Sequence, residues 1–368
     1  MLQAATVASP LSERLWPALD RERLDGELAA FLDESRRRYV ANPHLRPLFA
    51  RAAEFVLRGG KRLRPRLCLA SYRILSGKNE PPPRPVWLAA ASLELFHAFM
   101  LVHDDLIDGS VTRRGKPTLH EAIRRDGPAP SDPGQAADLG IIAGDLLFAL
   151  GMRMVNRSGL DDASLARANR LLADMLLETG LGEALDVLYD DQPLELLSEG
   201  QIVEAYLRKT ARYSVSGPLV LGASLAGAPA SACRALDRFG DLLGLGYQIR
   251  NDLEALEVDP DEGDHPDLDG GKRTLLLRKV HERLSDSGRR ALAVALELPP
   301  GIPRRRVLLG LIADSGAAAE CRARLDCLRA EAVDTLVRSP LDPTQRRAFV
   351  SLSALFQPGS AAIAEVHS

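Results

Sequence analysis

Three aspartates occupy a single turn near residue 105. The segment at residues 102–108 reads VHDDLID, so Asp104 and Asp108 are four residues apart and Asp105 lies beside them. Residues with this spacing share one face of a helix, with Cβ atoms about 6 Å apart. A solvent-exposed helix end is one interpretation, but carboxylates are unfavourable near a helix C-terminus. Mg²⁺ typically bridges a few carboxylates to phosphate oxygens, so the cluster favours binding of a metal and a diphosphate.

A second polar cluster begins 147 residues later (251 − 104). The segment at residues 247–259 reads YQIRNDLEALEVD, with Asn251 and Asp252 followed by further acids. Acidic helix ends are common, so this cluster is a weak signal by itself.

Basic residues gather in two segments, GGKRLRPR at residues 59–66 and RRGK at residues 113–116. A run of charges is usually a solvated helix face. Here two glycines allow the backbone to approach a ligand, and a proline stiffens the exit. Guanidinium and ammonium groups suit diphosphate oxygens. RRGK follows the acidic turn closely. The acidic and basic clusters together therefore suit two phosphate groups, one bound through a metal ion and one bound directly by the basic side chains.

The composition excludes several classes of protein. Apolar residues make up 46% of the 368 residues and charged residues 26%, which is ordinary for a globular protein. The net charge of −3 gives no basic excess for nucleic acid. The N-terminus lacks the basic and apolar regions of a secretory signal. Four cysteines without a CxxC pair indicate neither a disulfide framework nor a cysteine zinc site, so we expect a cytoplasmic protein.

One charge-free stretch has the length of a membrane span. Residues 213–233 carry no charge, but they include two prolines, three glycines and four serines. We therefore expect a buried helix of a large core there, and no membrane span elsewhere.

Helical periodicity dominates the chain, and alternating strand-like runs are essentially absent. The best helical segments are residues 24–40, 86–106, 136–155, 160–188 and 318–337. They predict an all-α fold of about a dozen helices. We expect one domain over residues 21–357, with an N-terminal extension at 1–20 and a C-terminal tail at 358–368.

Six segments in order resemble the trans-isoprenyl diphosphate synthases, the polyprenyl synthetase family. They read GGKRLRP, LELFHAFMLVHDDLIDGSVTRRGKPTLH, IIAGDLL, LRKTARY, GYQIRND and GGKRTLLL. The resemblance implies one all-α bundle of mostly antiparallel helices around a central cavity, usually a homodimer. It also implies three Mg²⁺ ions, an allylic diphosphate and isopentenyl diphosphate as substrates, and a product related to geranylgeranyl diphosphate.

Residue roles follow from the same resemblance. Asp104 and Asp108 match the Mg²⁺ ligands on the allylic diphosphate, with Asp105 between them, and Arg113 matches a contact to that diphosphate. The isopentenyl diphosphate site is matched by Lys61, Arg64, His97 and Arg114. The groups that line the leaving group and the carbocation path are matched by Lys209, Thr210, Gln248 and Lys272.

His97 has a plainer interpretation as a satisfied core histidine. It precedes Asp104 by seven residues, which places both on one helical face and favours the binding role.

The second acidic motif departs from the family pattern DDxxD. Its five positions are Asn251, Asp252, Leu253, Glu254 and Ala255. An amide oxygen is still a hard ligand, so Asn251 and Asp252 remain the expected ligands of a third Mg²⁺ ion. We expect activity with a raised Mg²⁺ requirement.

This departure leaves two alternatives. Class I terpene cyclases have a second motif led by Asn, and Asn251, Ala255 and Asp259 have that spacing without its middle ligand. A cyclase, however, has no use for an isopentenyl diphosphate site. A non-catalytic subunit of a heteromeric synthase is the other alternative. The intact DDLID motif argues against it, since such a subunit need not keep metal ligands.

Product length is expected to depend on Phe99, five residues before Asp104. A large aromatic there resembles family members that make short products, although core packing would explain it equally. We expect geranylgeranyl diphosphate, and farnesyl diphosphate as the second choice.

Overall fold

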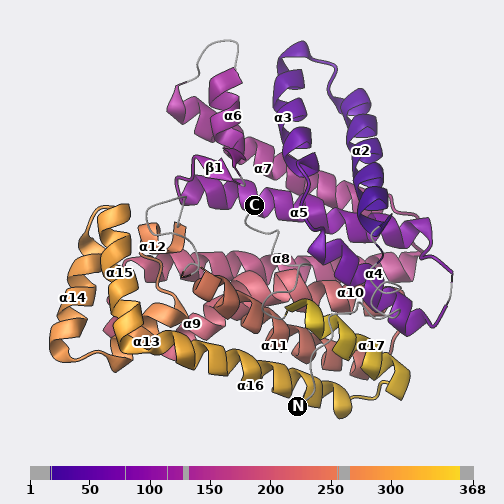
Figure 1. The fold of residues 1–368 in the computed structure, drawn as a ribbon. Helices are drawn as coiled ribbons and strands as arrows, with labels where there is room; N and C mark the ends of the chain where they lie inside the picture. Colours follow the sequence, from indigo (N-terminus) through magenta and orange to yellow (C-terminus); the bar gives the residue numbers. More distant parts are fainter. Residues whose placement is uncertain are drawn as a thin grey trace. The chain divides into compact units, whose positions relative to one another are not determined.

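A computed structural model describes residues 17, 19–78, 80–113, 115–126, 132–254, 256 and 266–356 (Figure 1). Contacts along the chain divide it into two compact units. Unit 1 takes its described residues from Met1–Arg170, Pro218–Pro229 and Pro343–Ser368, and unit 2 from Leu171–Gly217 and Ala230–Asp342. Each unit is therefore built from separated segments, and the single domain over residues 21–357 stays a prediction.

Unit 1 is helical apart from one hairpin. Its elements are α2 Leu19–Tyr39, η1 Pro43–Leu45, α3 Arg46–Leu57, α4 Leu63–Ser76, α5 Arg84–Ile107, β1 Thr112–Arg113, β2 Lys116–Pro117, α6 Leu119–Asp126, α7 Pro133–Asn156, α10 Gly217–Leu225 apart from its first residue, α17 Pro343–Ser353 and η4 Ala354–Phe356. The helix α8 Asp162–Asp190 starts in unit 1 and continues in unit 2.

The described secondary-structure elements of unit 2 are all helices. Its further elements are η2 Leu194–Leu196, α9 Glu199–Tyr206, η3 Leu207–Ser216, α11 Ala230–Glu254, α12 Pro266–Gly270, α13 Leu275–Arg283, α14 Asp286–Glu297, α15 Ile302–Ser315 and α16 Ala317–Val337. The all-α prediction is confirmed. Several helices are short, so the described residues hold more of them than the dozen expected.

The predicted helices at residues 24–40, 86–106, 136–155, 160–188 and 318–337 correspond to α2, α5, α7, α8 and α16. Their ends agree within a few residues because each segment has a clear apolar stripe and strong helix formers. The hairpin of β1 and β2 was not predicted, since two residues per strand are too few for an alternating pattern.

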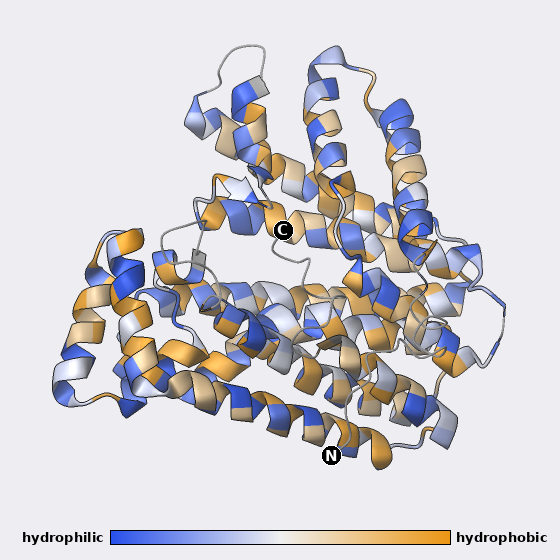
Figure 2. Ribbon diagram, in the orientation of Figure 1, coloured by the Kyte–Doolittle hydropathy of each residue, from blue (hydrophilic) through white to orange (hydrophobic). Residues whose placement is uncertain are grey.

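The core of unit 1 forms around α5. This helix packs against α7 and α4, and Trp87, Leu93 and Phe96 are fully buried or nearly so. Figure 2 shows its long hydrophobic stretches. Among the described residues, α5 is the helix long and apolar enough to cross a membrane, but 72% of the relevant window is buried. That burial is the pattern of a core helix. The sequence analysis considered residues 213–233 alone as a stretch of membrane length, and α5 is a second such stretch.

Residues 213–233 are not one buried helix, as was expected. They are divided among the end of η3, the whole of α10 and the start of α11. Most of their apolar side chains are nevertheless buried, including Tyr213, Leu219 and Leu221. A stretch without charges has no polar face to set the helical phase, so its breaks were not visible in the pattern.

In unit 2, α11 packs against both η3 and α16, and α16 runs along α11 and α13 in Figure 1. The element η3 is a π-helix, a rare wide helix that is frequent at functional sites. Its contact with α11 requires glycine, because a Cβ atom at Gly244 would lie 2.5 Å from the Cα atom of Ala211.

Gly244→Ala should therefore destabilise the protein. The added methyl group meets backbone, which cannot rotate away, and overpacking of this kind costs about 1–3 kcal/mol. The matched control is Gly246→Ala on the same helix, where the nearest atom would be the Leu325 Cδ2 at 3.8 Å. That control should be neutral or stabilising, since alanine is the better helix former. Urea denaturation measures both, and equal stabilities of the two variants would contradict the packing argument.

Candidate active site

The acidic turn lies at the C-terminal end of α5, as predicted. Arg113 of β1 folds back over it: its Nε donates to Asp105 Oδ1 at 2.6 Å, and its Nη2 donates to Asp104 Oδ2 at 3.0 Å. The hairpin of β1 and β2 reverses the chain after α5, so that Arg113 lies against the C-terminal end of that helix. Asp108, the C-cap residue of α5, is exposed.

Asp105 differs from its two neighbours in burial. Its side chain is fully buried, whereas that of Asp104 is 22% exposed. Burial raises the pKa of the Asp105 carboxyl to about 6, although the Arg113 guanidinium opposes this shift. Among the described residues, Asp105 Oδ2 has no hydrogen-bond partner. Asp105 therefore anchors Arg113, while Asp104 and Asp108 are the carboxylates that a ligand can reach.

The basic loop before α4 has a strained backbone. Gly59 and Gly60 have positive φ, and so does Arg62 at φ 53°. A non-glycine residue in this region is strained by roughly 1–2 kcal/mol and persists where its surroundings hold it. Arg62 is held by its side chain, which donates to Asp25 at 2.7 Å, Glu94 at 2.8 Å and the Val56 carbonyl at 3.0 Å.

This buried network connects the loop to α5. Arg62 and Glu94 are both almost fully buried. Burial would lower the pKa of Arg62, but the charges and hydrogen bonds of Glu94 and Asp25 together raise it above its usual value. Lys61 precedes Arg62 directly, Arg64 lies in the first turn of α4, and His97 follows Glu94 by one turn of α5. The Arg62–Glu94 ion pair therefore fixes the loop with the two predicted cations to the helix with the predicted histidine.

The two predicted lysines of unit 2 meet at one carboxylate. Lys209 Nζ lies 2.6 Å from Asp186 Oδ2 and 3.1 Å from Glu183 Oε1. Lys272 Nζ lies 2.9 Å from Asp190 Oδ2 and 3.5 Å from Asp186 Oδ2. Burial alone would raise the pKa of Asp186, but the two ammonium groups outweigh it and lower the pKa below its usual value.

Thr210 and Gln248 form a second group in unit 2. The Thr210 hydroxyl donates to Gln248 Oε1 at 3.0 Å, and Gln248 Nε2 donates to Asp252 Oδ1 at 3.2 Å. The other oxygen of Asp252 accepts from the hydroxyl of Tyr206 at 2.6 Å. Burial, followed by the negative charge of Asp267, raises the pKa of Asp252 well above its usual value, against the effect of its hydrogen bonds.

The second acidic motif is only partly described. Asn251 Oδ1 is buried and has no hydrogen-bond partner among the described residues. Glu254 forms an ion pair with Arg250 at 2.8 Å. Arg114, Ala255 and Asp259 lie outside the described residues.

Phe99 lies in an aromatic cluster of unit 1. Its ring packs edge-on against Phe148 of α7, with centroids 5.4 Å apart, and against His103, with centroids 4.9 Å apart. Phe148 also contacts Phe96 at 5.8 Å. The orientation of Phe99 is thus fixed from two sides.

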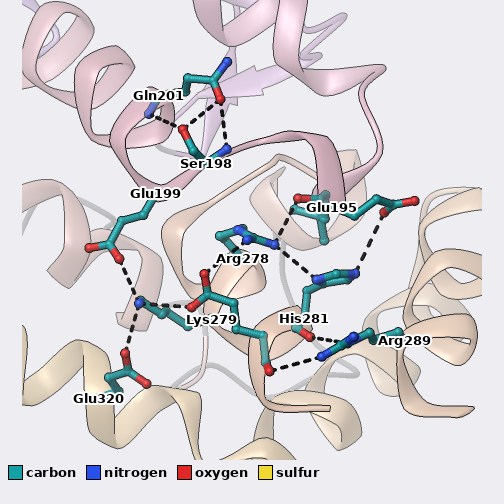
Figure 3. Close-up of polar contacts among 11 residues, drawn as sticks. Glu195, Ser198, Glu199, Gln201, Arg278, Lys279, His281, Arg289 and Glu320 are labelled. Atoms are coloured by element: carbon teal, nitrogen blue, oxygen red, sulfur yellow. Dashed lines mark hydrogen bonds and ion pairs between the residues drawn. The ribbon is translucent and has the colours of Figure 1, made fainter. Parts of the chain in front are cut away.

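A polar cluster around α13 anchors α9, the helix that leads into η3 (Figure 3). Lys279 Nζ lies 2.8 Å from Glu199 of α9, 3.0 Å from Glu320 of α16 and 3.1 Å from Glu282. Burial would lower the pKa of Lys279, but these carboxylates raise it above its usual value. Ser198 and Gln201 form a capping box at the start of the same helix.

Several residues of these networks were missed by the sequence analysis. Glu183, Asp186 and Asp190 recur at helical spacing, so their shared face on α8 was a usable signal. Glu94 and Tyr206 gave no signal, because a single polar residue in an apolar helix does not reveal its partner. Among the described residues, no group of three or more His, Cys, Asp or Glu side chains is arranged to hold a metal ion.

Comparison with known proteins relates the chain to one family. The sequence model of the polyprenyl synthetase family matches residues 46–299. A geranylgeranyl diphosphate synthase of Sulfolobus acidocaldarius is 31% identical over 244 residues, which are 65% of this chain and 68% of that protein. A geranylfarnesyl diphosphate synthase of Aeropyrum pernix is 30% identical over 311 residues, covering 80% and 88%.

A solved structure agrees over a longer range. The geranylgeranyl pyrophosphate synthase of Corynebacterium glutamicum, crystallised with isoprenyl diphosphate and magnesium, superposes with a TM-score of 0.84. It is 29% identical, and the match covers 92% of this chain and 98% of that one.

Removal of the Arg62 guanidinium should be costly. Arg62→Met leaves the Glu94 carboxylate buried without its cation, and breaking a buried ion pair on one side costs about 3–5 kcal/mol. The control is Arg84→Met, which removes an ion pair to Glu27 whose arginine side chain is 66% exposed. Exposed pairs contribute about 0–1 kcal/mol. Chemical denaturation compares the two variants, and similar losses would mean that the buried pair is not a special constraint.

Proposed function

Since the chain belongs to the polyprenyl synthetase family and is a prenyltransferase making short-chain prenyl diphosphates, we propose that its main product is geranylgeranyl diphosphate. In this proposal, isopentenyl diphosphate is joined head to tail and in trans to an allylic diphosphate. The observation that carries the assignment of residues is the turn of Asp104, Asp105 and Asp108 with Arg113 folded onto it. This turn brings oxygen ligands and a diphosphate-binding cation together in one place.

The donor atoms fit Mg²⁺. Asp104 and Asp108 supply carboxylate oxygens at an accessible helix end, and Mg²⁺ commonly takes one or two carboxylates and completes its shell with phosphate oxygens and water. A protein cage of three acids is therefore not required. Asn251 supplies a buried carbonyl oxygen without a hydrogen-bond partner in the described part of the chain, which is a fitting hard ligand. Bound Mg²⁺ would stabilise the negative charge of the leaving diphosphate.

Residues of unit 1 bind the substrates in this proposal. Arg113 is held by Asp105 and directs its guanidinium to the allylic diphosphate. Lys61, Arg64 and His97, with Arg114, bind isopentenyl diphosphate. Holding the acceptor in place makes the bond-forming step effectively intramolecular, which lowers its entropic cost.

In this proposal, residues of unit 2 stabilise the departing diphosphate and the allylic cation. When the allylic carbon–oxygen bond breaks, its electron pair leaves with the diphosphate, and Lys209 and Lys272 stabilise that anion. The double bond of isopentenyl diphosphate then attacks the allylic cation. Loss of a proton from the acceptor carbon gives the new double bond, with the departing diphosphate as the base. Oxygen atoms of Thr210 and Gln248 stabilise the cation along this path.

A single assay tests the activity. Purified protein is incubated with isopentenyl diphosphate, Mg²⁺ and each allylic primer, and the products are identified by mass. An elongated diphosphate is expected. A cyclic hydrocarbon would establish the cyclase alternative, and no turnover would establish a non-catalytic subunit.

We further propose a cytoplasmic homodimer. All four cysteines are free, which agrees with a reducing compartment. On α7, the apolar residues Ile141, Ile142 and Leu146 are 41–49% exposed, and a second copy of the chain would cover them. Sedimentation of the purified protein tests the dimer.

Asn251→Asp should lower the Mg²⁺ requirement. A carboxylate binds Mg²⁺ more strongly than an amide oxygen, so the Mg²⁺ concentration for half-maximal rate should fall severalfold. The control Asn42→Asp makes the same change at an exposed N-cap, where aspartate caps equally well. An unchanged Mg²⁺ dependence in Asn251→Asp would contradict the assignment of Asn251 as a ligand.

Phe99→Ala should lengthen the product. In the proposed role its ring closes the path of the growing chain, so its removal should add one or more five-carbon units. Phe99→Tyr retains the ring and should retain the product. Mass analysis reads out both variants, and an identical product from Phe99→Ala would place the end of the path at another residue.

A further inference from the structure

A continuous series of hydrogen bonds runs through unit 2 from a backbone amide to a predicted catalytic threonine. The Leu275 N–H of α13 donates to the Tyr206 oxygen of α9 at 2.9 Å. The Tyr206 hydroxyl donates to Asp252 at 2.6 Å, Gln248 donates to the other oxygen of Asp252 at 3.2 Å, and Thr210 of η3 donates to Gln248 at 3.0 Å. The series thus joins four elements of unit 2.

The direction of the series is fixed at its first member. A backbone N–H can only donate, so the Tyr206 oxygen accepts there and its own hydrogen is directed to Asp252. The 2.6 Å separation of the Tyr206 and Asp252 oxygens is that of a short O–H···O hydrogen bond. The other oxygen of Asp252 accepts from Gln248 Nε2. Gln248 thus turns its NH₂ group to Asp252 and its carbonyl oxygen to Thr210.

The last bond decides what Thr210 presents to a ligand. Its hydroxyl has one hydrogen, which is used in the bond to Gln248, so the remaining lone pairs of its oxygen are directed elsewhere. If the Gln248 amide were reversed, Thr210 would accept from the NH₂ group and turn its hydrogen outward. A cation is stabilised by oriented oxygen dipoles and opposed by an outward hydrogen. The orientation of Gln248 therefore has a catalytic consequence.

We propose that Tyr206 and Asp252 are positioning residues, and that Asp252 orients Gln248 and Thr210 instead of ligating a metal ion. The proposal rests on the function proposed above. Both oxygens of Asp252 have protein donors, and the residue is 3% exposed. Its neighbour Asn251 has the buried oxygen without a hydrogen-bond partner in the described residues. The two adjacent residues of the second acidic motif thus have different tasks.

Tyr206→Phe is the first test, because it removes only the hydroxyl group. Asp252 then loses the donor that fixes its orientation. The expected result is a decrease of kcat by about tenfold, equal to about 1.4 kcal/mol, with the KM for isopentenyl diphosphate and the Mg²⁺ dependence unchanged. The matched control is Tyr72→Phe, a buried tyrosine of unit 1, which should retain wild-type kinetics. A wild-type kcat in Tyr206→Phe would overturn the proposal.

Asp252→Asn separates positioning from metal binding. An asparagine side chain can accept on one side only and donates on the other, so it cannot keep both neighbours in place. The positioning role predicts a fall in kcat that excess Mg²⁺ does not restore, whereas restoration by Mg²⁺ would establish Asp252 as a ligand and overturn the proposal. In the double variant Tyr206→Phe/Asp252→Asn the two losses should be less than additive, and full additivity would also count against it.

All variants are measured at a temperature where circular dichroism shows them folded. If Tyr206→Phe does not fold, Asp252→Asn and its Mg²⁺ titration decide alone. An inactive wild-type protein would refute the proposed function, whereas an active wild type with a normal Tyr206→Phe variant would refute the positioning role alone.

Discussion

A group that is to bind a diphosphate must be stable before the diphosphate arrives. Isolated charges in a partly buried site carry a large desolvation cost, and two groups of the predicted charges are each held by opposite charges. Arg113 lies between Asp104 and Asp105, and Asp186 lies between Lys209 and Lys272. These ion pairs also fix the side chains in place. A bound diphosphate can then replace a carboxylate as the partner of a cation without moving that cation.

The fold supplies this arrangement by bringing helix ends and distant loops together within each unit. In unit 1 the buried Arg62 connects α2, the basic loop and α5. In unit 2, Lys279 connects α9, α13 and α16, so the helix that ends at Tyr206 is anchored at its other end as well. Stability and site geometry therefore depend on the same ion pairs, and a substitution far from the chemistry can alter both.

The fold class and most long helices could be predicted from the sequence, because an apolar stripe of constant period sets both the element and its buried face. The acidic turn was equally readable, since Asp104, Asp105 and Asp108 are neighbours in the chain. The tertiary partners of the predicted site residues could not be predicted from the sequence. The pairing of Lys209 with Asp186, or of Tyr206 with Asp252, arises from tertiary packing of segments 23 and 46 residues apart, and no local pattern encodes it. The π-helical form of η3 was also invisible, since its composition suits an α-helix.

The π-helix has a consequence for how this protein can change over evolution. Its wider turn sets the angular positions of Lys209 and Thr210 relative to the helices on either side. An α-helix turns by about 100° per residue, so the loss of one residue that returned the segment to α-helical spacing would rotate everything after it by a large fraction of a turn. Substitutions within η3 leave that register intact, whereas single-residue insertions and deletions do not. Apart from Lys209 and Thr210, the segment should therefore vary among relatives in residue type and remain constant in length.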